Sequence, residues 1–541
     1  MLLLSNDLLN DVRVQKEART LADAGHDVVV LARKTDRSLD YEELDGFRVL
    51  RLRPSFKNNL SHQFQKAAIA LRADVYHCHD HETLAIGAIA AVENNALFTY
   101  DSHELWESKF ECEWKGNYFR RLRFKLREAM LIRYASAVIT VSGSIGEYLQ
   151  GKHRLKHVAV LRNVPELIEN IEVLDLRKVL EIPREKKIVV YVGGISPGRG
   201  LEHMIEALQW LEDVVLVIIG EGARTEYERT LLQRADSLKV SHKICRMKYH
   251  PFNTMIRYVA SADLGIVYIQ NLNLSYLYSL PNKLFEYLLA GIPIIASDMP
   301  EIRKIVDEYQ VGCIVELADS RRLGEKIKHV LSDPDLAAQF RSNARRAIRE
   351  NNWQLESKKL VALYEELRVK SSQARNRLPT PLPESSSRIR CGSLLLVCLN
   401  SSPAEVLANI EKDVTWDTVT TITRSRYGLI DGARTIYVNG LLGLFSKGVL
   451  REVTGDGNDT AIFIYKKRYK ADFLTTLIAG MCRAKRRLAT TNDRKSGYDM
   501  FDATFWSRLF RSHRLPAIKG YMKILARGVV SPGNRSPMPS S

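Results

Sequence analysis

The residues best suited to chemistry lie in a glycine-rich turn between a predicted strand and a predicted helix. In YVGGISPGRGLEHMIEALQWL (191–211), this turn holds Gly193, Gly194 and Arg199. Glycines remove Cβ atoms, so backbone N–H groups at the start of a helix can approach a phosphate, which the helix dipole also favours. Arg199 would add a fixed positive charge. Taken alone, the stretch fits a phosphate site or a plain glycine turn with a surface arginine.

Two common nucleotide-binding loops match this turn poorly. Its spacing approaches the ATPase pattern G-x4-G-K-[ST], but it lacks the lysine and the hydroxyl that would hold Mg²⁺. The dinucleotide pattern G-x-G-x-x-G is absent as well. The turn therefore disfavours an ATPase and a nicotinamide-dependent dehydrogenase.

A second stretch, SLPNKLFEYLLAGIPIIASDMPE (279–301), places Lys283 and Glu286 three residues apart on one face of a predicted helix. Lys283 could neutralise a phosphate. A carboxylate beside a diphosphate would be repelled unless it accepted hydrogen bonds from hydroxyls, as the diol of a ribose offers. An exposed Lys–Glu pair is the ordinary alternative, and the framing by Pro281 and Pro293 disfavours it.

The elements that must position these stretches are apolar, β-rich runs that alternate with amphipathic segments. The runs lie at 1–5, 26–32, 46–52, 96–100 and 136–142, and again at 187–193, 214–220, 263–269 and 292–297. Such alternation predicts parallel sheets with helices on both faces. We therefore expect an α/β protein with two doubly wound, Rossmann-like domains facing a cleft, where ligands of such folds bind.

The same pattern sets the expected domain boundaries. A first Rossmann-like domain spans 1–165 and a second spans 166–352, with the seam near Pro165. Residues 371–391 are rich in proline and serine and predict a linker. Residues 392–541 form a basic C-terminal extension of unknown type. In it we expect a small α/β module with strands at 393–400, 434–439 and 460–465 and a helix at 473–489.

The net charge of +17 is unevenly distributed along the 541 residues. Residues 371–541 carry 27 basic and 13 acidic side chains, whereas residues 1–370 carry 53 basic and 50 acidic ones. Any attraction to nucleic acid or to a membrane must therefore be sought first in the C-terminal extension. That extension has no recognisable nucleic-acid-binding module, so nucleic acid ranks below a membrane surface as a partner.

Three features favour a cytoplasmic location. The seven cysteines are scattered without a C-x-x-C pair, which fits a reducing compartment better than disulfides or structural zinc. The start, MLLLSNDLLND, has too few consecutive apolar residues for a signal peptide. The longest apolar runs, among them LLLVCL (394–399), are far shorter than the roughly 18 residues that span a bilayer. Attachment to the inner face of the membrane stays open as an alternative.

These stretches belong to a series of motifs that occurs in the order of a known family. The series comprises NDLLNDVRVQKEARTLADAGHDVVVLA, ADVYHCHD, TYDSHEL, SAVITVS, LRNVP, GGISPGRG, VIIGEG, ASADLGIV and LPNKLFEYLLAGIPIIAS. With them the sequence resembles the retaining nucleotide-sugar glycosyltransferases of the GT-B fold, of the family four (glycosyl transferases group 1) type, in an LPNK-containing subgroup. The resemblance covers residues 1 to about 370. WQLESKKLVALYEELR resembles the family's closing helix, which would cross back to the first domain over 353–370.

The resemblance implies roles for particular residues. The catalytic residues would be His103, Arg199 and Lys283, the two cations by stabilising charge on the leaving nucleotide. Donor binding would involve Gly193, Gly194, Glu221, Gly222, Asn282 and Glu286. The residues themselves, rather than the resemblance, suggest His79 and Asp80 as acceptor-side groups. Asp101 or Glu104 could do the polar work there if His103 is only a packing histidine. No metal and no cofactor are implied, because the cations supply the charge that Mg²⁺ supplies in other transferases.

The sequence departs from the family pattern at two positions. Tyr278 stands where the first glutamate of the E-x7-E motif would fall, and Asn271, Asn273 or Asn282 could take over its contact to the donor sugar. Gly194 stands where many members carry an arginine, which would leave the diphosphate to two cations alone. We interpret these departures as marks of a subgroup rather than of an inactive enzyme.

Three polar stretches leave more than one interpretation open. In HCHDHE (77–82) the histidines alternate, but no fourth zinc ligand follows by spacing, which favours a polar strand end over a metal site. Residues 115–135 interleave basic and apolar side chains, which suits a helix on anionic lipid or a helix packed on its own domain. The basic clusters 466–470 and 483–487 could serve the same membrane surface, bind nucleic acid or be solvated.

The favoured function is the transfer of a sugar from a nucleotide diphosphate sugar, with retention at the anomeric carbon, to a lipid-linked or saccharide acceptor. Surface polysaccharide or glycolipid synthesis is the expected setting. Two alternatives stay open: a nucleotide-sugar 2-epimerase on the same fold, and a catalytically impaired scaffold that binds nucleotide sugar.

Overall fold

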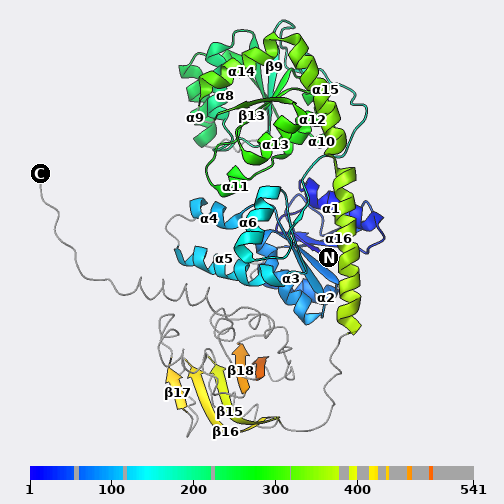
Figure 1. Ribbon diagram of the computed structural model, residues 1–541, viewed down its shortest axis with the longest axis vertical. Coiled ribbons are helices and arrows are strands. Elements are labelled where there is room, and N and C mark those ends of the chain that lie inside the picture. Colours follow the sequence, from blue (N-terminus) through cyan, green and yellow to red (C-terminus); the bar gives the residue numbers. More distant parts are fainter. Residues whose placement is uncertain are drawn as a thin grey trace, which may run out of the picture. The chain divides into compact units, whose positions relative to one another are not determined.

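The protein is represented by a computed structural model that describes residues 1–53, 60–113, 118–220, 226–316 and 319–376, and five strands beyond them. Its contacts separate two compact units, residues 1–377 and 378–541. The first unit contains two sheets and the second contains one (Figure 1). No helix in the described part of the chain is long and apolar enough to cross a membrane.

The first sheet has eight strands in the order β3-β4-β2-β1-β5-β6-β7-β8, all parallel except β3. They are β1 (Leu2–Leu3), β2 (Val29–Arg33), β3 (Tyr41–Leu44), β4 (Phe47–Leu52), β5 (Val75–His79), β6 (Leu97–Ser102), β7 (Ala137–Thr140) and β8 (Ala159–Val160). The associated helices are α1 (Val12–Asp23), α2 (Leu60–Leu71), α3 (Asp80–Glu93), α4 (Trp106–Glu113), α5 (Tyr118–Leu131) and α6 (Gly143–His153). Consecutive strand residues are buried because helices cover both faces.

The second sheet has six parallel strands in the order β11-β10-β9-β12-β13-β14. They are β9 (Lys187–Val192), β10 (Val214–Ile219), β11 (Ile244–Met247), β12 (Leu264–Val267), β13 (Ile294–Ser297) and β14 (Gly312–Val315). The associated helices are α7 (Leu176–Val179), α8 (Leu201–Ala207), α9 (Glu226–Ser237), α10 (Phe252–Val259), α11 (Leu274–Leu277), α12 (Asn282–Ala290), α13 (Pro300–Tyr309), α14 (Ser320–Ser332) and α15 (Pro334–Glu350).

Both sheets follow one plan, in which the first strand lies in the interior and later strands are added on either side of it. The strand order reverses between β1 and β5 and again between β9 and β12. Connections diverge at such a reversal and leave a crevice at the carboxyl ends of the strands, where ligands bind. His79 ends β5 and Gly193 follows β9, so both stand at these crevices.

The long helix α16 (Trp353–Asn376) returns the chain to the first domain (Figure 1). Trp353, Leu360 and Leu367 pack in one apolar cluster with residues of α1. The indole Nε1 of Trp353 donates a hydrogen bond to Thr20 Oγ1 at 3.0 Å. A helix therefore lies where the closing helix (353–370) was predicted, and it continues to Asn376.

The described residues of the second unit form one sheet of five strands: β15 (Ile389–Cys398), β16 (Val414–Thr423), β17 (Arg434–Tyr437), β18 (Thr460–Tyr465) and β19 (Arg486–Thr491). All are parallel, in the order β17-β16-β15-β18-β19. The strands predicted at 393–400, 434–439 and 460–465 are present with shifted bounds. The helix predicted at 473–489 is wrong at its end, because Arg486–Thr491 form β19, the edge strand that pairs with β18. Residues 473–485 lie outside the described residues.

The predicted two-domain α/β architecture is confirmed, and each run predicted as a strand in the first 300 residues overlaps an observed one. β5 (Val75–His79) was expected only as a polar strand end within 77–82, and β16 was missed because threonines fill it. The predicted linker, 371–391, begins inside α16 and ends inside β15, while 377–388 lie outside the described residues.

Candidate functional site

The first wall of the site follows β9, where Gly193 has the positive φ of +136°. A Cβ atom at Gly193 would lie 3.3 Å from Lys283 Nζ and 3.4 Å from the Tyr191 hydroxyl oxygen. That hydroxyl donates a hydrogen bond to the carbonyl of Gly194 at 2.9 Å. The absence of a side chain at Gly193 thus leaves the end of β9 open toward Lys283.

Lys283 lies in the first turn of α12 and is buried, with 7% of its surface exposed. Its Nζ has no hydrogen-bond partner among the described residues and lies 3.7 Å from the centroid of the Tyr191 ring. Burial, and then the charge of Arg199, lower the pKa of Lys283 well below its usual range. A buried amine without a partner is costly, and an anion placed against it would remove that cost.

Arg199 lies on the same wall, in the turn between β9 and α8. The carbonyl of Gly198 accepts a hydrogen bond from the backbone N–H of Gln270 at 3.0 Å. The guanidinium carbon of Arg199 lies 5.7 Å from the centroid of the Tyr276 ring. Gly200 has a φ of +72°, and a Cβ there would come within 2.1 Å of the Tyr268 ring. Residues 268–276 therefore hold the turn that carries Arg199.

Glu286 follows one helical turn after Lys283. Burial raises its pKa to about 7, against the opposing charges of Lys283 and of Lys16 from α1. Lys16 donates a hydrogen bond to the carbonyl of Val164 at 2.5 Å, at the junction of the two domains. Glu286 thus lies where cations of both domains act on it.

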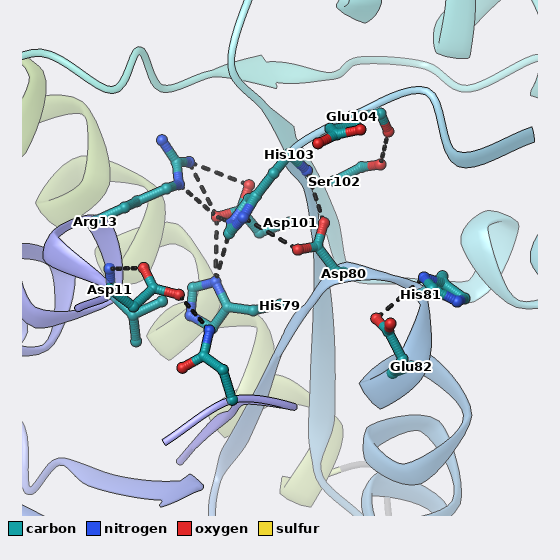
Figure 2. Close-up of polar contacts among 12 residues, drawn as sticks. Asp11, Arg13, His79, Asp80, His81, Glu82, Asp101, Ser102, His103 and Glu104 are labelled. Atoms are coloured by element: carbon teal, nitrogen blue, oxygen red, sulfur yellow. Dashed lines mark hydrogen bonds and ion pairs between the residues drawn. The ribbon is translucent and has the colours of Figure 1, made fainter. Parts of the chain in front are cut away.

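The opposite wall is formed by the ends of β5 and β6 in the first domain (Figure 2). His103 Nδ1 lies 3.2 Å from Asp80 Oδ2, and its Nε2 lies 3.2 Å from Asp101 Oδ2. Asp80 has a φ of +61°, and its Oδ1 accepts hydrogen bonds from the backbone N–H of His103 and from Trp106 Nε1. Both ring nitrogens of His103 are therefore engaged by carboxylates.

These carboxylates determine the charge of His103. Burial alone would lower its pKa, but Asp80 and Asp101 raise it well above the usual range. The side chain is thus an imidazolium held between two carboxylates, with about a fifth of its surface exposed. In this state His103 can donate N–H bonds, but it has no free lone pair to act as a base.

Asp101 is fully buried beneath His103 and is held by Arg13 of α1 (Figure 2). Arg13 Nη2 lies 2.9 Å from Asp101 Oδ2, and Arg13 Nη1 donates to the carbonyl of Leu161 at 2.8 Å. Although burial opposes it, the guanidinium keeps the pKa of Asp101 well below its usual range. Asp101 therefore supports His103 from behind.

The two walls are joined by direct contacts across the domains. The backbone N–H of Leu105 donates to Ser275 Oγ at 3.1 Å, and Ser142 Oγ donates to the carbonyl of Tyr278 at 2.7 Å. The Tyr278 side chain packs against the apolar core of the first domain. The segment around Tyr278, where the resemblance led us to expect a glutamate, therefore connects the two domains.

Comparison with known proteins agrees with this arrangement. Residues 12–164 match the family model described as Glycosyltransferase Family 4, and residues 173–347 match that of Glycosyl transferases group 1. Together the two matches cover more than half of the chain. The chain belongs to the group 1 glycosyltransferases of the GT-B fold. It is accordingly an enzyme that transfers sugar from a nucleotide-sugar donor.

The relatives of this glycosyltransferase carry names with different activities. An uncharacterized glycosyltransferase of Methanocaldococcus jannaschii is 24% identical over 370 residues, 64% of this chain and 91% of that protein. A phosphatidyl-myo-inositol mannosyltransferase of Mycobacterium leprae is 24% identical over 204 residues, 35% of this chain and 50% of that protein.

Solved structures show the same fold. Sucrose-phosphate synthase from Thermosynechococcus elongatus has a TM-score of 0.57 at 19% identity, covering 68% of this chain and 99% of that one. An Anabaena protein crystallised with UDP-glucose has a TM-score of 0.52 at 17% identity, covering 69% and 99%. At these identities the likeness extends to the fold alone.

The structure brings most of the predicted site residues of the glycosyltransferase onto the two walls. Gly193, Arg199, Lys283 and Glu286 gather on the second domain, and His79, Asp80, Asp101 and His103 gather on the first. The remaining predictions are less central. Glu104 pairs with Lys109 at 2.8 Å, Asn282 is exposed, and Asn273 caps α11. Glu221 and Gly222 lie outside the described residues.

Sequence reasoning missed the support that α1 gives to the site. Arg13, Lys16 and Glu17 lie on one buried face of α1, and Arg13 Nε lies 2.9 Å from Glu17 Oε1. The spacing of four residues between an arginine and a glutamate was a readable signal of that pair. The contact between Arg13 and Asp101 could not be predicted, because the two residues are 88 positions apart in the sequence.

One buried cluster of the glycosyltransferase has the composition of a metal site. Glu17, His77, His79 and Asp101 offer ligand atoms that all lie within 4.8 Å of one another. Arg13 already contacts both carboxylates, and burial raises the pKa of Glu17 toward its neutral form. Burial also lowers the pKa values of both histidines. The charge of Arg13 and protonation of Glu17 can therefore balance the carboxylates of this cluster without a metal ion. That the enzyme needs no metal stays our prediction.

Alanine at Gly193 is expected to lower both stability and donor affinity. A residue other than glycine at this φ costs about 1–3 kcal/mol, and the added Cβ would crowd Lys283 Nζ at 3.3 Å. Urea denaturation and donor titration measure the two effects. Gly194→Ala is the matched control for stability, because a Cβ there meets nothing within 4 Å. Equal losses of stability in both variants would contradict the assigned strain.

The charge of His103 predicts a pH dependence of stability. Because its pKa is raised in the folded protein, its protonation stabilises the fold fully below an unfolded pKa of about 6.5. This contribution is lost as the pH rises through the folded value. The free-energy difference of unfolding between wild type and His103→Gln, measured in urea from pH 6 upward, should therefore shrink as pH rises. A difference that grows with pH would contradict the imidazolium.

Proposed function

We propose that this glycosyltransferase moves a sugar from a nucleoside diphosphate sugar to a saccharide or lipid-linked acceptor, with retention at the anomeric carbon. The expected setting is surface polysaccharide or glycolipid synthesis. The observation that carries the donor half of the proposal is Lys283, whose buried Nζ has no hydrogen-bond partner among the described residues and faces the open end of β9. A diphosphate bound there would supply the missing anion.

The cations of the second domain account for departure of the nucleotide. As the bond between the sugar and the β-phosphate breaks, negative charge develops on the leaving oxygen. Lys283 and Arg199 are held in place by α12 and by contacts of the glycine turn, so the two side chains need little rearrangement. A bound diphosphate would raise the lowered pKa of Lys283 and so favour its charged form. Preorganised charges of this kind stabilise the transition state more than the bound substrate.

Glu286 suits the nucleoside end of the donor. Its pKa of about 7 in the free enzyme leaves the carboxyl able to accept hydrogen bonds from a ribose diol once it is ionised. Lys283 and Lys16 both favour that ionised form. The position one turn after Lys283 would place the diol next to the diphosphate on the same helix.

Retention is supported by the state of the first-domain wall. An inverting transfer needs a base on the acceptor side, whereas Asp80 and Asp101 are both committed to His103, itself an imidazolium. In a front-face attack the leaving phosphate oxygen takes the proton of the acceptor hydroxyl. The acceptor oxygen then bonds to the anomeric carbon on the face that the phosphate leaves.

A lipid-linked acceptor is supported by the name of the Mycobacterium leprae relative, a phosphatidyl-myo-inositol mannosyltransferase. The basic helix α5 would then lie near anionic lipid. Its Phe124 and Glu128 are buried against the first domain, and Lys125 pairs with Glu107 at 2.6 Å. Lipid contact therefore depends on the remaining basic residues of α5, and sedimentation with phosphatidylserine vesicles tests it.

The proposal is tested with a panel of UDP-, GDP- and ADP-sugars, read by thermal shift and by NMR of the anomeric proton in the product. One nucleotide should stabilise the protein and give a product with the donor's anomeric configuration. An inverted product would refute retention. Binding without turnover would favour the scaffold, and conversion of the donor sugar at its C2 would favour the epimerase.

A further inference from the structure

Two serines connect the two domains of the glycosyltransferase through a reciprocal pair of hydrogen bonds. The backbone N–H of Leu105, in the first domain, donates to Ser275 Oγ of the second domain at 3.1 Å. In return, the backbone N–H of Leu274, in the second domain, donates to Ser108 Oγ of the first domain at 3.0 Å. Each domain thus supplies one serine acceptor and one backbone donor. We call these four residues the serine clasp.

Both donors of the serine clasp stand at the start of a helix, where backbone N–H groups have no partner within the helix. Leu105 directly precedes α4, and Leu274 is the first residue of α11. Asn273, the N-cap of α11, accepts from the N–H of Tyr276 and leaves that of Leu274 to Ser108. Among the described residues, neither donor has an acceptor in its own domain. The two bonds therefore form only when α4 and α11 are in contact, as they are here (Figure 1).

Burial makes the serine clasp sensitive to the loss of either hydroxyl. Ser108 is 6% exposed and Ser275 is 5% exposed. A buried N–H that loses its acceptor is left unsatisfied, whereas the same N–H bonds to water once the two domains separate. Removal of one serine hydroxyl therefore favours the open arrangement of the domains over the closed one.

On the first domain, the serine clasp is attached to the support of His103. Leu105 follows His103 by two residues, and the next side chain, Trp106, donates through Nε1 to Asp80 Oδ1 at 2.8 Å. The same oxygen accepts the backbone N–H of His103 at 3.0 Å, and Asp80 Oδ2 lies 3.2 Å from His103 Nδ1. A shift of the segment around Leu105 would therefore move the His103 side chain.

On the second domain, the serine clasp is attached to the turn that carries Arg199. Ser275 precedes Tyr276, whose ring centroid lies 5.7 Å from the guanidinium carbon of Arg199. A Cβ atom at Gly198 would lie 3.3 Å from the Tyr276 ring and 2.7 Å from Leu272. Ser275 thus belongs to the segment against which the glycine turn packs.

We propose that Ser108 and Ser275 are positioning residues, which hold the domains closed and so set the side chain of His103 against that of Arg199. This assignment rests on the proposed roles of His103 and Arg199 in sugar transfer. Both serines act through the backbone segments that they bond. Because a misplacement of about 1 Å can lower a rate about 100-fold, loss of the serine clasp should affect turnover. Nucleotide binding at Lys283, on the second domain, should be affected much less.

The first test is amide hydrogen exchange of the full chain, without nucleotide, in Ser275→Ala and in Ser108→Ala. Opening of the domains exposes both donors, so Ser275→Ala should also speed exchange at Leu274, whose own acceptor is intact. The rate at both donor amides should rise about 5-fold or more. Ser261→Ala is the matched control, because Ser261 Oγ accepts the N–H of Leu176, the first residue of the equally short α7, at 3.1 Å within the second domain. There exchange should rise at Leu176 only.

The second test separates positioning from folding and from nucleotide binding. In Ser275→Ala, kcat with the sugar donor that the wild type uses should fall about 10-fold or more. The affinity for UDP, GDP or ADP, whichever binds the wild type, should stay within about twofold, since the variant acts on the transition state rather than on nucleotide binding. Ser261→Ala should match the wild type in both measurements, and circular dichroism checks that each variant is folded.

Two outcomes would overturn the proposal. Faster exchange at Leu105 alone in Ser275→Ala would show that the effect of the hydroxyl is local and that the domains stay closed without it. Unchanged turnover in a variant with faster exchange at both donor amides would show that closure does not position the site. A wild type that binds no nucleoside diphosphate would contradict the proposed function instead, and the exchange experiment, which needs no nucleotide, would still decide whether the serine clasp closes the domains.

Discussion

Replacing Lys283 with methionine is expected to stabilise the free protein and to abolish sugar transfer. The buried Nζ has no partner among the described residues, and an unsatisfied buried polar group costs about 1–3 kcal/mol. Methionine fills a similar volume without that cost. Loss of one preorganised charge from the transition state should lower kcat about 10²–10³-fold. Urea denaturation and product formation measure the two effects on the same preparation.

Lys243→Met is the matched control for this prediction. Lys243 is half-buried, and its Nζ donates to the carbonyls of Leu208 and Leu211 at 3.0 and 2.7 Å. Its replacement should lower the free energy of unfolding and leave turnover unchanged. A Lys283→Met protein that is less stable than wild type would show that Nζ has a structural partner. Unimpaired turnover in that protein would remove Lys283 from the catalytic site.

Replacing Arg13 with methionine is expected to destabilise the protein by about 3–5 kcal/mol, because it leaves a buried carboxylate without its counter-charge. Arg13 contacts Asp101 through two nitrogens, and both side chains are almost completely buried. Asp101 would lose the group that holds its pKa low, and His103 would lose its fixed support. Thermal and urea denaturation measure the loss, and activity should fall with it.

Two comparisons isolate the cause of that loss. Arg48→Met breaks an exposed pair with Asp27 at 2.6 Å and should cost about 1 kcal/mol or less. Adding Asp101→Asn to Arg13→Met removes the unpaired negative charge. The double variant should recover part of the lost free energy of unfolding, but not the activity. If the double variant is less stable than Arg13→Met alone, the cost does not come from an unpaired carboxylate.

The fold was predictable from the sequence because the signals that specify it are local. Runs such as 188–193 and 214–220 are apolar throughout, as strands buried on both faces must be, and β9 and β10 overlap them. The donor wall was predictable for a related reason. Lys283 and Glu286 are neighbours on one helix, and Gly193 follows directly on a strand.

The first-domain wall was less predictable, because its chemistry depends on contacts between distant residues. His103 could be named as a site residue, but its charge follows from Asp80 and Asp101 on two different strand ends. Arg13 lies on the first helix, and no spacing in the sequence connects it with Asp101. The contact of Tyr278 with the first domain could not be predicted either, because its hydrogen-bond partner, Ser142, lies in the other domain.

The sheet of the second unit was also predicted only in part. Three of its strands were visible as apolar runs, but β19 begins with two arginines and was taken for the end of a helix. Its parallel pairing with β18 involves no local pattern. In this sheet, as in the other two, the first strand is interior. That order can be derived only once the pairing of all five strands is known.

The central claim is that Lys283 and Arg199 hold a diphosphate at the end of β9. Calorimetric titration of the wild type and of Lys283→Met with the nucleoside diphosphate and monophosphate of the preferred base tests it most directly. In the wild type the diphosphate should bind at least about 10-fold more tightly, since each tenfold corresponds to about 1.4 kcal/mol of added contact. In Lys283→Met the diphosphate and the monophosphate should bind to the donor site with equal affinity. An equal preference for the diphosphate in both proteins would contradict the account.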